Sequence, residues 1–370
     1  MVTQELAAHE AAAMRRAIAL AGDAVGRTNP NPAVGAVVLD ATGAVVGEGA
    51  TQPVGGAHAE VEALTAAGAS ARGGTLVVTL EPCRHAGRTP PCTDAITAAG
   101  VRRVVYALAD PHDLAAGGAE VLRAAGIDVE GGFLTEEAAV DLGPWLVAVR
   151  RRRPHLTWKY AATLDGRTAA ADGTSRWITG ADARVDVHRL RARCDAVVVG
   201  IGTVLADDTA LTVRDWPTQR QPLRVVVDGK ARTPLSARIL DDAASTVVAV
   251  GNDAEPQRVS NLRAAGADVV ELARHDGHLD LHGLLAELYR RDALQLLLEG
   301  GATLAGSFVR QRLVDKVVGY HAPALLGAGP PVLADAGVTT LAAALRLHLD
   351  DVRRLGDDVR VEATVERGVG

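Results

Sequence analysis

Three potential metal ligands, widely spaced along the chain, set the strongest constraint on how this sequence can fold. His58 is followed by Cys83 and Cys92, and Glu60 stands two residues after the histidine. A structural zinc site closes its tetrahedron with four protein ligands, whereas three ligands leave one position open for water. The pattern therefore predicts a catalytic zinc site in which Glu60 moves a proton of that water.

The length of 370 residues exceeds one typical domain of about 100 to 200 residues, so two domains are expected. Charged residues make up 23% and hydrophobic ones 48%, which argues against long disordered segments. Aromatic residues, at 3%, are too scarce for base-stacking platforms, and a net charge of -6 does not suit a surface that tracks phosphates. Nucleic acid is therefore not an expected partner, whereas a small anionic substrate held by local arginines is.

The cysteine content fits a reducing compartment. Cys83, Cys92 and Cys194 form an odd, sparse set that does not build a disulfide framework, and Cys194 is interpreted as a small buried hydrophobic residue. Residues 1–16 lack the apolar stretch of a signal peptide, and no run approaches the roughly 20 apolar residues that span a bilayer. We expect a cytoplasmic protein with no membrane partner.

Hydrophobic periodicity predicts alternating helices and strands in the first part of the chain. A hairpin is expected at residues 40–43, where Gly43 marks the turn between two strands. The predicted helices cover residues 5–25, 58–67, 91–99 and 119–125, and the predicted strands cover residues 34–39, 44–48, 75–80, 101–108 and 127–130. This alternation is typical of a three-layer α/β domain.

Four arginines at positions 150–153, followed by Pro154, mark the predicted domain boundary. We interpret this run as a solvated linker or helix end rather than a phosphate-binding patch. The α/β alternation then restarts, with strands at 156–162, 196–199, 223–227, 246–250, 268–271, 294–298 and 314–320, and helices at 181–193, 257–265, 279–289 and 303–312. One domain is therefore predicted over residues 1–150 and a second over 151–370.

Two other interpretations of the ligand pattern stay open. The residues could form a structural zinc knot with His85 as a fourth ligand, or the two cysteines could be buried beside an unrelated histidine. Neither explains why a carboxylate follows His58 so closely. We therefore favour a catalytic site and expect His85, with Arg88, near the substrate, although a surface role remains an alternative.

Glycine-rich turns in the second part suggest a nucleotide site. Residues 197–202 end a strand in Gly-x-Gly, but Leu205 stands where the dinucleotide fingerprint has its third glycine, so this signal is weak. Residues 203–214 are expected to form a polar loop that contacts a ligand. A second turn, at residues 299–307, joins a strand to a helix whose free N–H groups can cradle a phosphate.

The pattern of His58-x-Glu60 with Pro82-Cys83 resembles the zinc-dependent nucleobase deaminases, in which the carboxylate is the acid/base and not a ligand. Eight residues separate the two cysteines here, where two are commoner. This longer loop, together with Asn29-Pro30-Asn31-Pro32, resembles the RibD family of bifunctional riboflavin biosynthesis proteins. The resemblance implies a cytidine deaminase-like zinc domain that removes the 2-amino group of diaminohydroxy-phosphoribosylamino-pyrimidine, and a dihydrofolate reductase-like domain that uses NADPH to reduce the ribosyl chain.

The same resemblance implies the residues of the second site. The cofactor would contact Ala161, Trp177, Thr203, Asp207, Gly301, Ala302, Thr303, Leu304, Ala305, Gly306 and Ser307. The substrate would contact Lys159, Ser175, Arg191, Leu211, Arg214 and Glu299, with the two arginines suited to its 5′-phosphate. The sequence departs from the family at residues 110–113, which usually are Asp-Pro-Asn-Pro, and at Gly229, where serine is frequent.

Several alternatives accompany these assignments. Trp177 could be a core residue, and Arg191 and Arg214 could form surface ion pairs. The histidines at 275, 278 and 282 are expected in a solvated turn rather than at a metal. There are two competing functions. One is a zinc deaminase of free nucleobases or nucleosides whose second domain only binds a nucleotide, and the other is a zinc-stapled regulatory module that senses a pyridine nucleotide. Self-association into a homo-oligomer is expected, since small α/β domains with Ala- and Leu-rich helices commonly associate.

Overall fold

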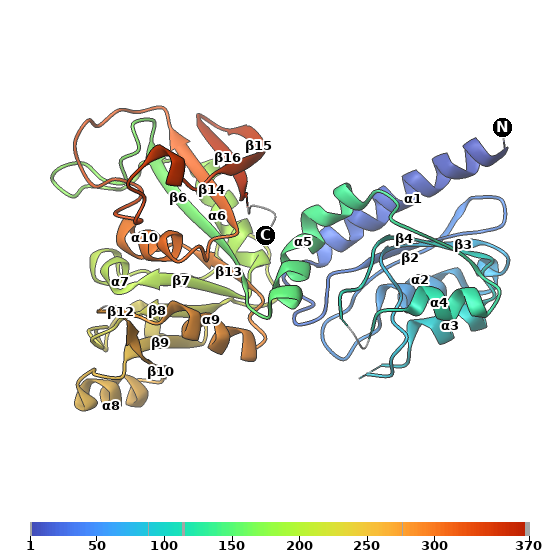
Figure 1. Cartoon of the computed structure of the whole chain (residues 1–370), viewed down its shortest axis with the longest axis horizontal. Helices are drawn as coiled ribbons and strands as arrows, with labels where there is room; N and C mark the ends of the chain where they lie inside the picture. Colours follow the sequence, from blue (N-terminus) through green and yellow to red (C-terminus); the bar gives the residue numbers. More distant parts are fainter. Residues whose placement is uncertain (1, 88, 113–114, 276, 367–370) are drawn as a thin grey trace. The chain divides into compact units, whose positions relative to one another are not determined.

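The computed structural model of the chain describes residues 2–87, 89–112, 115–275 and 277–366, with side chains from residue 8 onward (Figure 1). The chain divides into two compact units, Met1–Arg152 and Arg153–Gly370. None of the described helices is long and apolar enough to cross a membrane.

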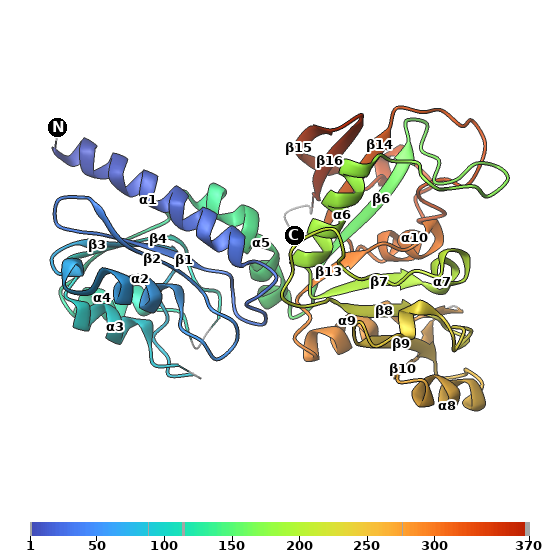
Figure 2. The same cartoon turned by 180° about the vertical axis from the view of Figure 1, so that it is seen from behind.

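The first unit is a mixed five-stranded sheet between two layers of helices (Figures 1 and 2). In the order β2-β1-β3-β4-β5, β1 pairs antiparallel with β2 and β3, and the remaining pairs are parallel. The strands are β1 (Gly35–Leu39), β2 (Val45–Ala50), β3 (Thr75–Leu80), β4 (Arg103–Leu108) and β5 (Asp128–Gly131). The helices are α1 (Val2–Ala24), α2 (Ala59–Ala67), α3 (Cys92–Ala99), α4 (Gly118–Ala124) and α5 (Thr135–Arg151), with the 3-10 turn η1 (Gly68–Ala71).

The two helical layers account for the burial of the central strands. Helices α1 and α5 cover one face of the sheet, and α2, α3 and α4 cover the other (Figure 2). Every residue of β1 and β3 is buried, because side chains on both faces of these strands meet a helix. The predicted three-layer α/β domain is confirmed.

Helix α2, which carries the start of the zinc motif, packs against β2 at unusually short range. A Cβ atom on Gly49 would lie 2.5 Å from the carbonyl oxygen of Ala59, at the first turn of the helix. Only glycine permits this approach, since real Cβ contacts stay beyond about 3 Å. The glycine in β2 therefore fixes where α2 begins.

The second unit is built on a nine-stranded sheet in the order β10-β9-β8-β7-β13-β6-β14-β16-β15. Its strands are β6 (His155–Thr163), β7 (Ala196–Gly200), β8 (Leu223–Val227), β9 (Thr246–Gly251), β10 (Asp268–Leu272), β13 (Gln295–Leu298), β14 (Lys316–Ala322), β15 (Leu347–Leu355) and β16 (Asp358–Val365). A separate hairpin pairs β11 (Arg274–His275) with β12 (His278–Leu279). The helices are α6 (Ala181–Arg193), α7 (Ile201–Asp207), α8 (Pro256–Ala264), α9 (Leu281–Arg290) and α10 (Ala302–Arg310), with the 3-10 turns η2 (Arg238–Leu240) and η3 (Leu341–Ala343).

Two cores lie on opposite faces of this sheet. Val198 of β7 packs in a cluster with residues of α9 and α10, whereas its neighbour Val199 packs in a cluster with residues of α7 and α8. Successive residues of a strand point to opposite faces, so a strand covered on both sides is apolar throughout. In the order across the sheet, every pair of neighbouring strands from β10 through to β14 is parallel. The pairs β14–β16 and β16–β15 are antiparallel.

Several elements differ from the sequence-based expectation, among them the β11–β12 hairpin, which was not predicted. Helix α5 was not predicted, and its last turn contains Arg150 and Arg151 of the arginine run. The predicted polar loop over residues 203–214 is wrong in its first part, because α7 extends to Asp207. The terminal hairpin of β15 and β16 was not predicted either.

Candidate active sites

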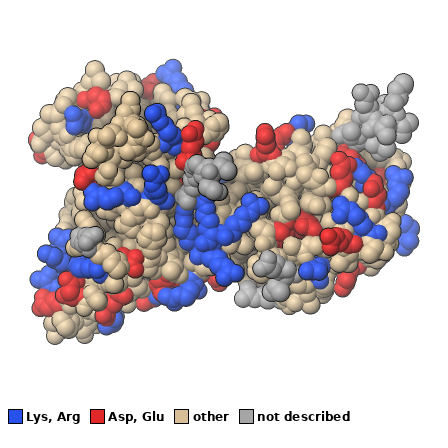
Figure 3. Space-filling model, in the orientation of Figure 1, with Lys and Arg blue, Asp and Glu red and all other residues tan. Residues whose placement is uncertain are grey.

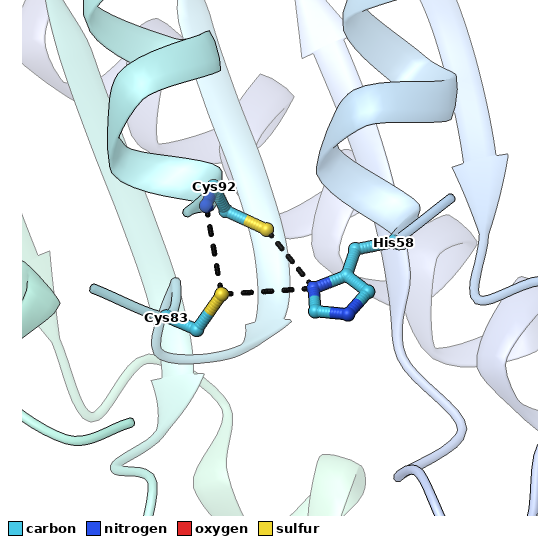
Figure 4. A group of neighbouring side chains, drawn as sticks. All are labelled: His58, Cys83 and Cys92. Carbon is cyan, nitrogen blue, oxygen red and sulfur yellow. Dashed lines mark hydrogen bonds between the residues drawn. The ribbon is translucent and has the colours of Figure 1, made fainter. Parts of the chain in front are cut away.

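The structure brings His58, Cys83 and Cys92 together near the carboxyl end of β3, the central strand of the first sheet (Figure 4). His58 is the N-cap of α2, Cys92 is the first residue of α3, and Cys83 follows β3. The Nδ1 atom of His58 lies 3.2 Å from the Sγ atom of Cys92 and 3.6 Å from that of Cys83. Among the described residues, these three form the one group of His, Cys and acidic side chains that could hold a metal ion.

The spacing of the three donor atoms fits zinc. Tetrahedral bonds of about 2.1 Å to nitrogen and 2.3 Å to sulfur place neighbouring N and S ligands about 3.6 Å apart. The Cys92 side chain and His58 hydrogen-bond to the Cys83 sulfur and lower the pKa of Cys83 to about 4. The hydrogen bond with Cys83, together with burial, raises the pKa of Cys92. A divalent cation between the donors favours both thiolates, which is the form that zinc binds.

Glu60 lies in the first turn of α2 and is 4% exposed. It does not belong to the group of three metal donors. Burial raises the pKa of its carboxyl group, while the charge of His58 and a hydrogen bond with Cys92 oppose this shift. A buried carboxyl group beside the donors, but outside the ligand set, is suited to hold and release a proton.

The loops around the donors are held by specific hydrogen bonds. The hydroxyl oxygen of Thr89 lies 3.3 Å from the Nε2 atom of His58, on the ring edge opposite the cysteines. The buried carboxylate of Glu81 accepts hydrogen bonds from the backbone N–H groups of Asp110, Gly117 and Ala119. It thereby ties Asp110, Gly117 and Ala119 to the strand that leads into Cys83.

The residues expected near the first substrate are only partly described. The Nδ1 atom of His85 is buried, and none of the described residues hydrogen-bonds to it. Arg88 and Asp113 lie outside the described residues. The assignment of His85 to the substrate therefore stays a prediction.

In the second unit, three of the predicted substrate residues form one buried charge cluster. Arg191 donates from Nε and Nη2 to the Glu299 carboxylate at 2.5 and 3.0 Å, and the Nζ atom of Lys159 lies 3.8 Å from it. Burial alone would raise the pKa of Glu299, but the charges of Arg191 and Lys159 outweigh it and lower that pKa to about 2. Burial lowers the pKa of Lys159, and Glu299 opposes this.

The two arginines assigned to a phosphate have different surroundings. Arg191 is 8% exposed, and its third donor reaches the backbone oxygen of Thr212, so the expected alternative of a surface pair does not describe it. Arg214 is exposed, and its Nη1 atom donates to the Thr212 hydroxyl at 3.2 Å. Arg214 is therefore the arginine whose side chain faces solvent.

Sequence reasoning missed His188, which is buried on α6 beside this cluster. Its Nδ1 atom accepts a hydrogen bond from the backbone N–H of Arg214 at 3.3 Å, and Nε2 lies 3.3 Å from Asp215. Burial, with the charges of Arg191 and Arg214, lowers the pKa of His188. No motif marks a single histidine within an Arg-rich helix, so the sequence carried no signal for it.

A cleft of about 720 Å³ opens at the carboxyl ends of β7, β8 and β13. Strand order reverses between β7 and β13, and open parallel sheets bind ligands at such a point. The cleft is lined by seven predicted cofactor residues, namely Thr203, Asp207, Gly301, Ala302, Thr303, Leu304 and Ser307. Its volume lies within the range of about 300 to 1,000 Å³ for cofactor pockets. Gly301, Ala302 and Thr303 at the start of α10 line the cleft, and the first N–H groups of a helix have no partner within the helix, so the site fits a dinucleotide.

The other predicted cofactor residues lie elsewhere. Ala305 and Gly306 are on the buried side of α10, and Ala161 packs against Ala183 and Tyr320 on the sheet. Trp177 is 70% exposed, with the Arg184 guanidinium 4.6 Å from its ring centre, so the core alternative is wrong.

The loop that carries Ser175 and Trp177 is nevertheless tied to the cleft. Arg176 donates to the backbone oxygen of Asp207, one of the residues that line the cleft.

Comparisons with known proteins match both units. The family described as the zinc-binding region of cytidine and deoxycytidylate deaminases matches residues 8–108, and the RibD C-terminal domain matches residues 154–361. Together, fold and site define the chain as a zinc-dependent deaminase joined to an NADPH-dependent reductase.

Relatives of known name match almost the whole chain. The riboflavin biosynthesis protein RibD of Mycobacterium tuberculosis is 46% identical over 338 residues, covering 90% of this chain and 91% of the relative. That of Escherichia coli is 41% identical over 360 residues, covering 94% and 96%. Acinetobacter baumannii RibD superposes with a TM-score of 0.86 at 38% identity, covering 98% of this chain and 100% of that one. The chain belongs to the RibD family, and it is a bifunctional enzyme of riboflavin biosynthesis.

Proposed function

We propose that the first unit removes the 2-amino group of 2,5-diamino-6-(5-phosphoribosylamino)pyrimidin-4-one and that the second reduces the ribosyl chain of the resulting uracil to ribityl. The observation that supports this most strongly is a His/Cys/Cys donor set with the buried, non-ligating Glu60 beside it. The solved Thermotoga maritima protein described as the deaminase and reductase of these two compounds is 35% identical and superposes with a TM-score of 0.85.

In the proposed deamination, His58, Cys83 and Cys92 hold zinc. The bound metal supplies Lewis-acid activation of a water molecule near neutral pH. Glu60 would accept the proton that the water loses and deliver it to the ring nitrogen, and it would then carry the proton of the added hydroxyl group to the amine that leaves as ammonia. Burial of Glu60 supports this role, because a raised carboxyl pKa makes the carboxylate a stronger base toward the proton of the water.

In the proposed reduction, NADPH lies in the cleft at β7, β8 and β13 and supplies the hydride. Lys159 and Glu299 hold the sugar, together with Ser175 and Leu211. Arg214 binds the 5′-phosphate, while Arg191 braces Glu299 rather than the ligand, since each of its three guanidinium nitrogens already donates to a protein oxygen. Positioning of this kind is the main protein contribution to hydride transfer.

We further propose that residues 1–150 and 151–370 act as the two catalytic domains, and that the protein works as a homo-oligomer in the cytoplasm. Three cysteines without a disulfide suit a reducing compartment.

The proposal is tested by supplying the diaminopyrimidine ribotide with and without NADPH and following ammonia and NADPH separately. Ammonia release without NADPH, and NADPH oxidation only when the ribotide is present, are the expected results. Consumption of neither substrate nor NADPH by zinc-loaded protein would contradict the proposed function.

A further inference from the structure

The cleft of the second unit has two chemically different ends. One end is formed by the first turn of α10, and the other by the turn after β8 and the β11–β12 hairpin. This second end contributes the cations Lys230, Arg232 and Arg274 to the cleft lining. Lys and Arg side chains gather on the surface around the place that Figure 1 labels β12 (Figure 3).

The turn after β8 is held rigidly by the buried Asp228. Its carboxylate accepts from the N–H and the hydroxyl of Thr233 at 2.7 and 2.8 Å, and its backbone oxygen accepts from the N–H of Ala231 at 3.0 Å. Lys230 lies inside this turn, and Arg232 follows it. Their side chains therefore start from a fixed backbone at the rim of the cleft.

Gly229 makes room for the third cation. A Cβ atom at this position would lie 2.9 Å from the Nη2 atom of Arg274. With glycine there, Arg274 donates to the backbone oxygens of Gly229 and Gly277 at 2.6 and 3.2 Å, and to Asp253 at 2.6 Å. The guanidinium group is thus locked against the turn that carries Lys230.

Of the three cations, two have an acidic partner nearby, and Lys230 is the one best placed to meet a ligand. Arg274 pairs with Asp253, and Arg232 lies 3.7 Å from Asp228. Lys230 is exposed, and within the described part of the chain it has no hydrogen bond or ion pair, although its charge also acts on the Asp253 carboxylate. An exposed ammonium group beside two braced guanidinium groups is suited to an anion with several oxygen atoms.

We propose that Lys230, with Arg232 and Arg274, binds the 2′-phosphate of NADPH and makes the reductase prefer NADPH to NADH. This inference rests on the proposed binding of the cofactor in the cleft. Because the cleft lining runs from the first turn of α10 past the ends of β7 and β8, a dinucleotide with its pyrophosphate at α10 would place its adenosine end beside Lys230. In dinucleotide folds the side chain after the second strand contacts the 2′ position of this ribose, and cations there accept a 2′-phosphate.

Binding measurements test the proposal without catalysis. Titration calorimetry of the full-length chain with 2′,5′-ADP and with 5′-AMP isolates the phosphate, since the two probes differ only in that group. The wild type should bind 2′,5′-ADP more tightly. Lys230→Gln should weaken 2′,5′-ADP and NADPH at least about tenfold, as expected for lost charge-assisted hydrogen bonds, and should leave 5′-AMP and NADH nearly unchanged.

Two further variants sharpen the result. Lys230→Arg keeps a cation and should retain most of the preference, whereas Arg232→Gln should reduce it. Arg258→Gln, which removes an exposed cation from α8 away from the cleft lining, is the matched control and should change nothing. Equal weakening of both probes by Lys230→Gln, or equal wild-type affinity for them, would overturn the proposal. Failure of the wild type to oxidise NADPH would instead overturn the proposed function.

Discussion

At the zinc site, the orientation of the His58 ring depends on a hydroxyl group outside the donor set. Thr89 contacts Nε2 of His58, while Nδ1 faces both cysteine sulfurs. A hydrogen bond at the far nitrogen fixes the tautomer in which the near nitrogen is free to bind metal. Thr89 is thus a positioning residue for the proposed ligand.

Thr89→Ala should lower zinc affinity about 10- to 100-fold, the usual effect of losing such a partner. Thr89→Ser keeps the hydroxyl and should bind zinc nearly as well as the wild type. Competition with a zinc chelator measures both affinities. Equal affinities for the Ala and Ser variants would show that the hydroxyl does not orient the ring.

Glu299 gives the second unit a pH-dependent contribution to stability. Its pKa in the folded chain, about 2, is lower than the ordinary value of 4.5. The stabilisation from the carboxylate is therefore fully present above about pH 4.5 and is lost as the pH falls through 2.

Glu299→Gln should lower the free energy of unfolding of the second unit by about 3 to 5 kcal/mol at pH 7, because it leaves Arg191 buried without its anion. Urea unfolding at pH 7 and pH 3 measures the difference between variant and wild type. The difference should shrink at the lower pH, and a difference that grows there would contradict the assigned sign.

At the scale of elements, the contact between β2 and α2 sets the position of the first zinc donor. Gly49→Ala should push the start of α2 away from the strand and displace His58, since the new Cβ atom meets the Ala59 oxygen. The expected cost is about 1 to 3 kcal/mol in the free energy of unfolding, with weaker zinc binding.

Gly143→Ala is the matched control, because a Cβ atom in that part of α5 meets nothing within 4 Å. It should keep wild-type zinc binding and be at least as stable to heat as the wild type, since alanine favours a helix over glycine. Thermal unfolding and zinc content are the readouts, and equal behaviour of the two variants would contradict the role of Gly49.

Sequence periodicity predicted most of the central elements because buried strands and amphipathic helices leave clear patterns. The terminal hairpin was missed because β15 is largely exposed and shifts register between Leu349 and Asp351, so no alternating face marks it. Helix α5 contains Pro144, which interrupts the pattern, although its buried Ala138, Leu142 and Trp145 have helical spacing that could have revealed it.

The zinc donors were predictable because the metal requires particular side chains, and their convergence is visible in the spacing. The residues of the second site were harder to predict from the sequence, because their roles depend on contacts with residues that are distant along the chain. Arg191 pairs with a carboxylate 108 positions away, and the bond between Arg214 and His188 joins a backbone group to a ring, which no motif encodes. Only the structure shows that Arg191 is buried against Glu299 whereas Arg214 is exposed.

On the scale of the whole molecule, one chain carries two chemistries that act in sequence on one substrate. The uracil form exists only after the amino group has left the ring. A reductase site that accepts only this deaminated compound therefore acts after the deaminase site. The proposed order predicts that a block at Glu60 also stops NADPH consumption from the diaminopyrimidine.

The most direct test of this account is Glu60→Gln supplied with the diaminopyrimidine ribotide and NADPH. The variant should keep about one zinc ion per chain and release ammonia at least about 100-fold more slowly, since general acid–base catalysis contributes a factor of that size or more. It should oxidise NADPH only after the deaminated ribotide is added. Ammonia release at the wild-type rate by the zinc-loaded variant would contradict the assignment of Glu60 and the mechanism built on it.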